Sequence, residues 1–153
     1  MSDLPHHLPS IVLVDDDADQ LFLTRKMLEK AGVKNPLVEI GGGPEAIAYL
    51  DGCGGHDGSA ETALPALVFL DLRMPTADGF DVLRWVRSKP ALSSVKVIIL
   101  TSSDDQDDVK RCTALGAQGF LMKHPNSAVL AAVLRQTLGE NVGLISAPAI
   151  LSA

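Results

Sequence analysis

Residues 66–80 read ALVFLDLRMPTADGF, and the fold class can be predicted from this stretch. Five apolar residues run without a break at 66–70 and are followed by a single carboxylate, Asp71. An unbroken apolar run of this length is typical of a parallel strand that helices cover on both faces. Pro75 and Gly79 follow within ten positions and indicate a turn. The stretch therefore predicts a buried strand that presents one acid at its carboxyl end.

The same pattern recurs along the whole chain. Apolar runs of strand length alternate with amphipathic stretches of helical length. The runs are at 11–14, 37–40, 66–70, 95–100 and 119–122, and the helical stretches at 18–32, 43–50, 80–88, 104–116 and 126–138. Strict alternation of this kind predicts an α/β, doubly wound five-stranded parallel sheet with helices on both faces.

Two of the predicted helices show which side chains face inward. In the first helix, Leu21 and Leu28 keep helical spacing, and we expect Phe22 and Leu23 to widen the same apolar face. In the third, the spacing predicts that residues 82, 83 and 86 face the core.

Composition narrows the classes of protein. The chain has 153 residues, enough for one domain with its own core, and a formal net charge of −6. This charge argues against nucleic acid or an anionic membrane surface as the main partner. The two cysteines lie far apart and predict free thiols in a reducing cytosol. The first ten residues lack the features of a signal peptide, so we expect a cytoplasmic protein.

The chain divides into a core segment and three less regular ones. We expect a flexible N-terminus at 1–9, a single folded domain at 10–138, and a C-terminal tail at 139–153. Residues 51–65 are rich in glycine and small polar side chains, which predicts a mobile surface loop. The apolar tail is too short to span a bilayer, and either docks on this protein or a partner, or frays.

Polar side chains follow most of the predicted strands. Because parallel strands end at a common edge, residues beyond their carboxyl ends are expected to lie together. They are Asp15, Asp16 and Asp17 after the first strand, Asp71 after the third, Thr101, Ser102 and Ser103 after the fourth, and Lys123 after the fifth.

This set of side chains favours a particular chemistry. Several crowded carboxylates raise one another's pKa unless a cation lies among them, and their hard oxygens favour Mg²⁺ over zinc. Lys123 adds a positive charge and Thr101 a hydroxyl donor. The combination predicts phosphoryl transfer, with Asp71 held in line with an incoming phosphoryl group. A simpler alternative for residues 15–17 is that Asp16 or Asp17 caps the first helix.

Four ordered motifs, IVLVDDD (11–17), VFLDLRMPTADGFDVL (68–83), VIILTSS (97–103) and GFLMK (119–123), resemble the receiver domain of two-component response regulators. The resemblance covers about residues 10–138 and implies a CheY-like fold with strand order 2-1-3-4-5. The longer loop closed by LPALVFLDL (64–72) is further similar to stand-alone receivers that partner phytochrome-type histidine kinases.

The resemblance implies a role for each acid. Asp71 would accept a phosphoryl group from a phosphohistidine of a sensor kinase. Asp16 and Asp71 would bind Mg²⁺ directly, Asp15 through water, and the backbone carbonyl of Arg73 would complete the protein ligands. Such a domain is a signalling module rather than an enzyme, although it assists its own phosphotransfer and autodephosphorylation.

The remaining roles follow from the same resemblance. Lys123 would pair with a phosphoryl oxygen, the Thr101 hydroxyl would move to bond another, and Phe120 would turn inward. Arg73 and Ser103 would tune the lifetime of the phosphoaspartate. The implied partners are a sensor histidine kinase or a histidine phosphotransfer protein, with a homodimer through the fourth helix, fifth strand and fifth helix.

One departure from the family stands after the fifth strand. The family usually has Lys-Pro with a cis peptide, whereas this chain reads Lys123-His124-Pro125. A cis bond before a residue other than proline costs about 3–4 kcal/mol, so we expect a trans loop or a shift by one residue. Two other functions stay open: a receiver-like binding module that needs no phosphorylation, and a magnesium-dependent aspartyl phosphatase.

Overall fold

The computed structural model describes residues 8–53, 63–102, 105–139 and 142–143. Five parallel strands form one sheet in the order β2-β1-β3-β4-β5, which confirms the predicted fold class. In chain order the elements are β1 (Ile11–Val14), α1 (Ala18–Lys30), β2 (Leu37–Ile40), α2 (Gly43–Asp51), β3 (Leu67–Leu70), α3 (Gly79–Arg87), the 3-10 helix η1 (Pro90–Leu92), β4 (Lys96–Thr101), α4 (Gln106–Ala114), β5 (Gly119–Met122) and α5 (Ser127–Leu138).

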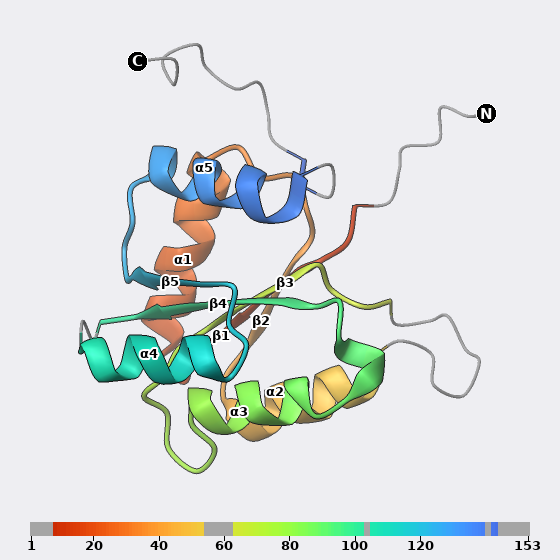
Figure 1. Cartoon of the computed structure of the whole chain (residues 1–153). Helices are drawn as coiled ribbons and strands as arrows, with labels where there is room; N and C mark the ends of the chain where they lie inside the picture. The colour runs from red at the N-terminus through yellow and green to blue at the C-terminus, as the bar shows by residue number, and fades with distance from the viewer. Residues whose placement is uncertain (1–7, 54–62, 103–104, 140–141, 144–153) are drawn as a thin grey trace, which may run out of the picture.

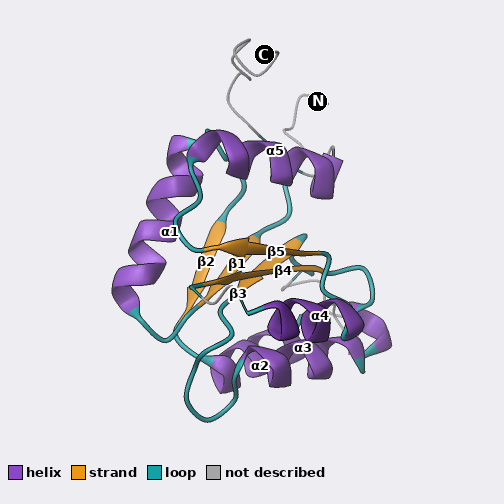
Figure 2. Ribbon diagram, turned by 60° about the vertical axis from the view of Figure 1, so that its left-hand side comes forward, coloured by secondary structure: helices purple, strands orange, loops and turns teal. Residues whose placement is uncertain are grey.

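Helices cover both faces of the sheet. Figure 1 shows α1 and α5 on one face and α2, α3 and α4 on the other, and Figure 2 shows the same layers from the side. Alternate residues of each strand enter opposite cores: in β3, Phe69 packs with Leu28 of α1 and Leu134 of α5, whereas Leu70 packs with Leu83 of α3. Both faces are therefore buried, as the unbroken apolar run in β3 predicts.

The bounds differ from the predicted ones by a residue or two. The third strand begins at Leu67, the fourth runs from Lys96 to Thr101, and the short 3-10 helix η1 follows α3. Thr101 belongs to the strand because it pairs with Met122 of β5. No helix in the described ranges is long and apolar enough to cross a membrane.

The prediction for one face of α1 was wrong. Leu21 and Leu28 are buried as expected, but Phe22 is 55% exposed and Leu23 is 38% exposed. Each residue turns a helix by about 100°, so the two residues after Leu21 rotate away from the sheet. The Phe22 ring lies under the Lys26 ammonium, 5.3 Å from its centroid. In α3, residues 82, 83 and 86 are buried, as predicted.

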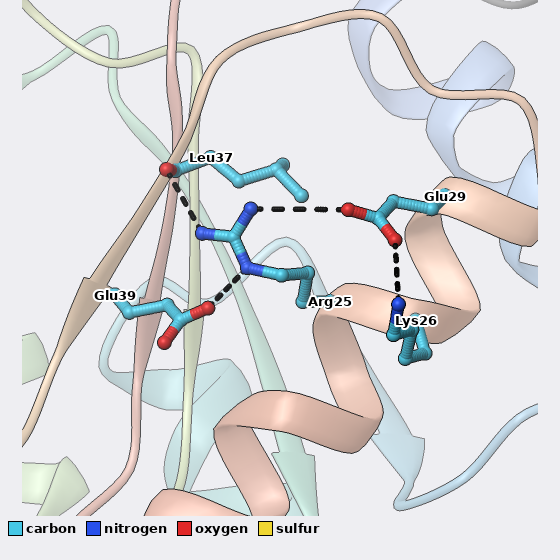
Figure 3. Close-up of polar contacts among 5 residues, drawn as sticks. All are labelled: Arg25, Lys26, Glu29, Leu37 and Glu39. Carbon is cyan, nitrogen blue, oxygen red and sulfur yellow. Dashed lines mark hydrogen bonds and ion pairs between the residues drawn. The ribbon is translucent and has the colours of Figure 1, made fainter.

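A cluster of charges joins α1 to the edge strand β2. The Arg25 guanidinium donates to the Leu37 carbonyl at 3.4 Å and forms an ion pair with Glu39. Glu29 forms ion pairs with both Arg25 and Lys26 (Figure 3), at 3.9 Å and 3.6 Å. Charges along an edge strand oppose pairing with another chain, so this cluster also protects the free side of the sheet.

Residues near both described ends meet at the edge where the strands begin. The buried Asn35 amide donates to the Pro9 carbonyl and accepts from the Gly143 N–H, each at 2.8 Å. The Lys34 N–H donates to the Gly143 carbonyl at 2.7 Å, and Val142 packs against the α1–α5 core. The start of the predicted tail thus contacts this protein. Residues 1–7, 144–153 and most of the predicted 51–65 loop lie outside the described residues.

Candidate functional site

The sheet places the predicted site residues at one edge by backbone pairing. The Asp15 N–H donates to the Ile40 carbonyl and the Asp71 N–H to the Val14 carbonyl, each at 3.1 Å. The Lys123 N–H donates to the Thr101 carbonyl at 2.8 Å. These bonds carry the ladder one residue past β1, β3 and β5, and hold the backbone of the site rigidly.

One lysine bridges two carboxylates at this edge. Lys123 Nζ lies 2.7 Å from Asp15 Oδ2 and 3.4 Å from Asp71 Oδ1. All three side chains are largely buried. Burial of two like charges is unfavourable, and a buried cation between them offsets this cost. The structure therefore brings together the predicted acceptor, its neighbouring acid and the predicted lysine.

The crowding shifts the pKa of two groups. Burial and the nearby Asp15 charge raise the pKa of Asp71 from 3.8 to about 6, although the Lys123 charge and the Arg73 backbone N–H act to lower it. Burial alone would lower the pKa of Lys123, but its bonds and charge interactions with Asp15 and Asp71 raise it. The ammonium form of Lys123 is thus stabilised, whereas the carboxylate form of Asp71 is destabilised without a further cation.

Three carboxylates are placed to hold a metal ion. Oxygens of Asp15, Asp16 and Asp71 all lie within 4.8 Å of one another, with Asp16 the exposed member. Asp17 instead caps α1, because its carboxylate accepts from the Asp19 N–H at 2.9 Å. Of the three consecutive acids, Asp17 therefore caps α1, whereas Asp15 and Asp16 belong to the carboxylate cluster. Three hard oxygen ligands beside an open cavity fit Mg²⁺.

The cluster opens into a cavity of about 440 Å³. Its lining residues are Asp15, Asp16, Asp17, Gln20, Asp71, Arg73, Ser102, Met122, Lys123 and His124. Sequence reasoning had not placed Gln20, Met122 or His124 there. The sequence pattern indicates an ordinary strand residue at Met122. The one signal that it lies near the site is its position directly before Lys123.

The two predicted switch residues lie behind the cavity rather than in its wall. Thr101 is fully buried at the end of β4. Phe120 is partly buried and packs against the core beneath α3 and α4. Ser103, predicted to affect the phosphoaspartate lifetime, lies outside the described residues.

Arg73 reaches from the site to a neighbouring helix. Its guanidinium donates to Asp108 Oδ2 on α4 at 2.6 Å. The Arg73 side chain is 61% exposed and that of Asp108 only 12% exposed. This contact joins residues that are 35 positions apart, and sequence reasoning did not find it.

The departure after β5 is accommodated with Lys123 in contact with Asp15. The described peptide bonds are all trans, and His124 takes up the extra residue with a φ of 61°. Asn126 then caps α5, its side chain accepting from the Val129 N–H at 2.8 Å. Of the two expected outcomes the trans loop is observed, and Lys123 still reaches Asp15.

Comparison with known proteins gives a consistent result. The family model described as response regulator receiver domain matches residues 11–135. Response regulator Rcp1 of Synechocystis sp. is 31% identical over 126 residues, which cover 82% of this chain and 84% of that protein.

Solved structures agree in fold. The crystal structure of the phosphorylated cyanobacterial phytochrome response regulator RcpA has a TM-score of 0.71 at 28% identity, covering 90% of this chain and 99% of that one. The Mn²⁺-bound form of response regulator Rcp1 has a TM-score of 0.70 at 27% identity, covering 90% and 99%.

Proposed function

Because this chain belongs to the response regulator receiver family, we propose that Asp71 is the residue that accepts the phosphoryl group. The observation that supports this most is the position of Lys123, which lies within 3.4 Å of Asp71 and 2.7 Å of Asp15. A cation held between two acids is suited to a site that gains negative charge. Residues 10–138 would form the receiver domain.

The reaction assigned to Asp71 is a displacement at phosphorus. A carboxylate oxygen of Asp71 forms a bond to phosphorus, while the phosphorus–nitrogen bond of a phosphohistidine breaks and its electron pair stays on the imidazole. Asp16 and Asp71 would hold Mg²⁺, together with Asp15 and the backbone carbonyl of Arg73. When bound, Mg²⁺ supplies positive charge that offsets the anionic carboxylates and phosphoryl oxygens. A Mn²⁺-bound relative supports a divalent metal here.

The neighbouring side chains would respond to the new charge. Lys123 is already oriented toward Asp71, and it would pair with an oxygen of the phosphoryl group. The Thr101 hydroxyl would turn to bond another oxygen, and Phe120 would move inward into the space that opens. Arg73 and Ser103 would influence the attack of water, which returns Asp71 to its free carboxylate in autodephosphorylation.

The partners follow from the family. Receivers partner histidine kinases, and we propose a phytochrome-type sensor kinase or a histidine phosphotransfer protein as the phosphoryl donor. The similarity to RcpA, a phytochrome response regulator, supports this choice. A homodimer through α4, β5 and α5 would carry the output, and we expect the protein to act in the cytoplasm.

Acetyl phosphate and Mg²⁺, followed by intact mass, test the acceptor. We expect one phosphoryl group on the wild-type protein, none on Asp71→Asn, and labelling retained in Asp107→Asn, a matched exposed acid. Lys123→Ala should still be labelled, but its Thr101 and Phe120 side chains should no longer move in response to the phosphoryl group. Full labelling of Asp71→Asn would refute the assignment. Release of more than one phosphate per chain from a phosphate monoester would instead indicate an aspartyl phosphatase.

A further inference from the structure

Arg73 forms a hydrogen bond with its backbone N–H and another with its side chain, to two different acids. Its backbone N–H interacts with the Asp71 carboxylate, and its guanidinium donates to Asp108 Oδ2 at 2.6 Å. Asp108 lies in the first turn of α4 and is buried. A single residue therefore connects the proposed acceptor to α4.

Arg73 is one of the residues that line the acidic cavity, but its guanidinium is paired with Asp108 on α4. Within the described residues, no ion pair joins Arg73 to Asp71. The Asp71 carboxylate pairs with Lys123 instead. A phosphoryl group would bring extra negative charge and strong acceptor oxygens to this cavity, and arginine binds such groups well.

We infer that Asp108 is a positioning residue, which holds the Arg73 guanidinium on α4 until phosphorylation draws it to the phosphoryl oxygens and releases that helix. This inference rests on the proposed function of Asp71. The exposed Arg73 side chain is free to reorient on its long stem, whereas Asp108 is fixed in α4. The two partners thus differ in mobility, and Arg73 is the one that moves.

Release of Asp108 would affect the packing of α4. Cys112 follows Asp108 by one helical turn and is buried in the core. Arg111 of α4 lies over the Phe80 ring of α3, 4.0 Å from its centroid. If the Arg73–Asp108 pair holds the first turn of α4, then opening the pair should make the Cys112 thiol more accessible.

Binding of beryllofluoride with Mg²⁺, measured by calorimetry, tests the first half of the inference. Asp108→Asn weakens the ion pair that must open when Arg73 turns to the bound beryllofluoride, which mimics the phosphoryl group. Beryllofluoride should therefore bind about tenfold more tightly, which corresponds to the net free energy of one charged hydrogen bond that no longer has to be broken. Asp107→Asn, on the same turn but exposed, should bind like wild type. In an Arg73→Gln background the effect of Asp108→Asn should vanish, and Asp108→Glu should restore wild-type affinity.

Alkylation of cysteines, read by peptide mapping, tests the second half. Cys112 of the wild-type protein should react several-fold faster with beryllofluoride than without it, whereas the buried Cys53 serves as internal reference. Arg73→Gln should make Cys112 more reactive even without beryllofluoride. This variant therefore also tests the inference if Asp108→Asn fails to fold. Unchanged Cys112 reactivity in both cases would overturn the inference.

Different results would refute the role of Asp71 as phosphoacceptor and the role of Asp108 as positioning residue. A wild-type protein that takes up no phosphoryl group from acetyl phosphate would refute the proposed function. A protein that is labelled on Asp71, but in which Asp108→Asn and Asp107→Asn bind beryllofluoride equally, would refute only the role of Asp108.

Discussion

The sheet ends β1 and β3 at the same edge and so brings Asp15 and Asp71 close together, and the single charge of Lys123 between them does not offset both carboxylates. The pKa of Asp71 is raised from 3.8 to about 6 by burial and by Asp15, even with Lys123 in contact. In metal-free protein, burial and the Asp15 charge therefore destabilise the ionised carboxylate of Asp71 near neutral pH. The same destabilisation favours the binding of a divalent cation beside Asp71.

Replacement of Asp71 by asparagine should stabilise the metal-free protein in a defined pH range. A raised pKa means that the folded state binds the proton more tightly than the unfolded state. Its stabilising effect is complete below about pH 4 and is lost as the pH rises through about 6. Above pH 6, Asp71→Asn should therefore unfold with a free energy about 2 kcal/mol higher than wild type.

Urea unfolding in a chelator at pH 4, 6 and 8 measures this difference. It should be small at pH 4, develop by pH 6 and stay constant to pH 8, and Mg²⁺ should reduce it by stabilising the wild type. Asp107→Asn serves as the control for loss of one acid. A difference that grew toward low pH would contradict the assigned shift.

At the scale of elements, the turn into α3 depends on a glycine for space. A Cβ at Gly79 would lie 2.5 Å from the Asp71 carbonyl oxygen and 2.8 Å from Leu72 Cα. Both are backbone atoms, so the chain itself would have to move. Gly79→Ala should lower the free energy of unfolding by about 1–3 kcal/mol and slow phosphorylation, because it displaces Asp71.

Gly52 offers a matched control for this change. A Cβ there would meet its nearest atom at 3.6 Å, an ordinary contact, at the end of α2. Gly52→Ala should leave stability unchanged or raise it slightly, with phosphorylation as in wild type. Chemical unfolding and the rate of labelling by acetyl phosphate measure both variants. Equal behaviour of the two would rule out the steric explanation.

The loop between β5 and α5 depends on a backbone conformation that most residues avoid. His124 has a φ of 61°, in the left-handed region. His124→Gly should raise the free energy of unfolding by about 0.5 kcal/mol, because glycine adopts this φ without a steric penalty. His124→Val should lower it by about 1–2 kcal/mol, since branched residues are outliers there. Thermal and urea unfolding of both variants would show this; a gain with valine would contradict it.

For the molecule as a whole, the sequence predicted the sheet and the residues at its edge, because both follow from local pattern. Unbroken apolar runs imply buried parallel strands, and parallel strands bring Asp15, Asp71 and Lys123 to one edge. Phe22 and Leu23 were misplaced because apolar type alone does not say which side of α1 meets the sheet. The contact of Arg73 with Asp108 depends on how α4 packs, and no local pattern records it.

Asn35 joins residues from both ends of the described chain, and its loss should be felt by the whole fold. Its side chain bonds to Pro9 and Gly143, and is buried. Asn35→Ala should lower the free energy of unfolding by about 1–3 kcal/mol, because two partly buried backbone groups lose their partner. Phosphorylation of Asp71 should be unchanged, since Asn35 lies where the strands begin and Asp71 lies where they end. Urea unfolding and labelling together check this; slowed labelling with normal stability would contradict it.

The Asn35 contacts also have a practical consequence. They bring Pro9 and Gly143 together before the strands begin, whereas the acidic cavity opens where the strands end. A fluorescent reporter attached beside either residue would lie at the end of the sheet where the strands begin, opposite the end where Asp71 lies. Paired dyes at these two positions should therefore register global unfolding as a change in energy transfer, without obstructing a kinase that approaches the opposite rim.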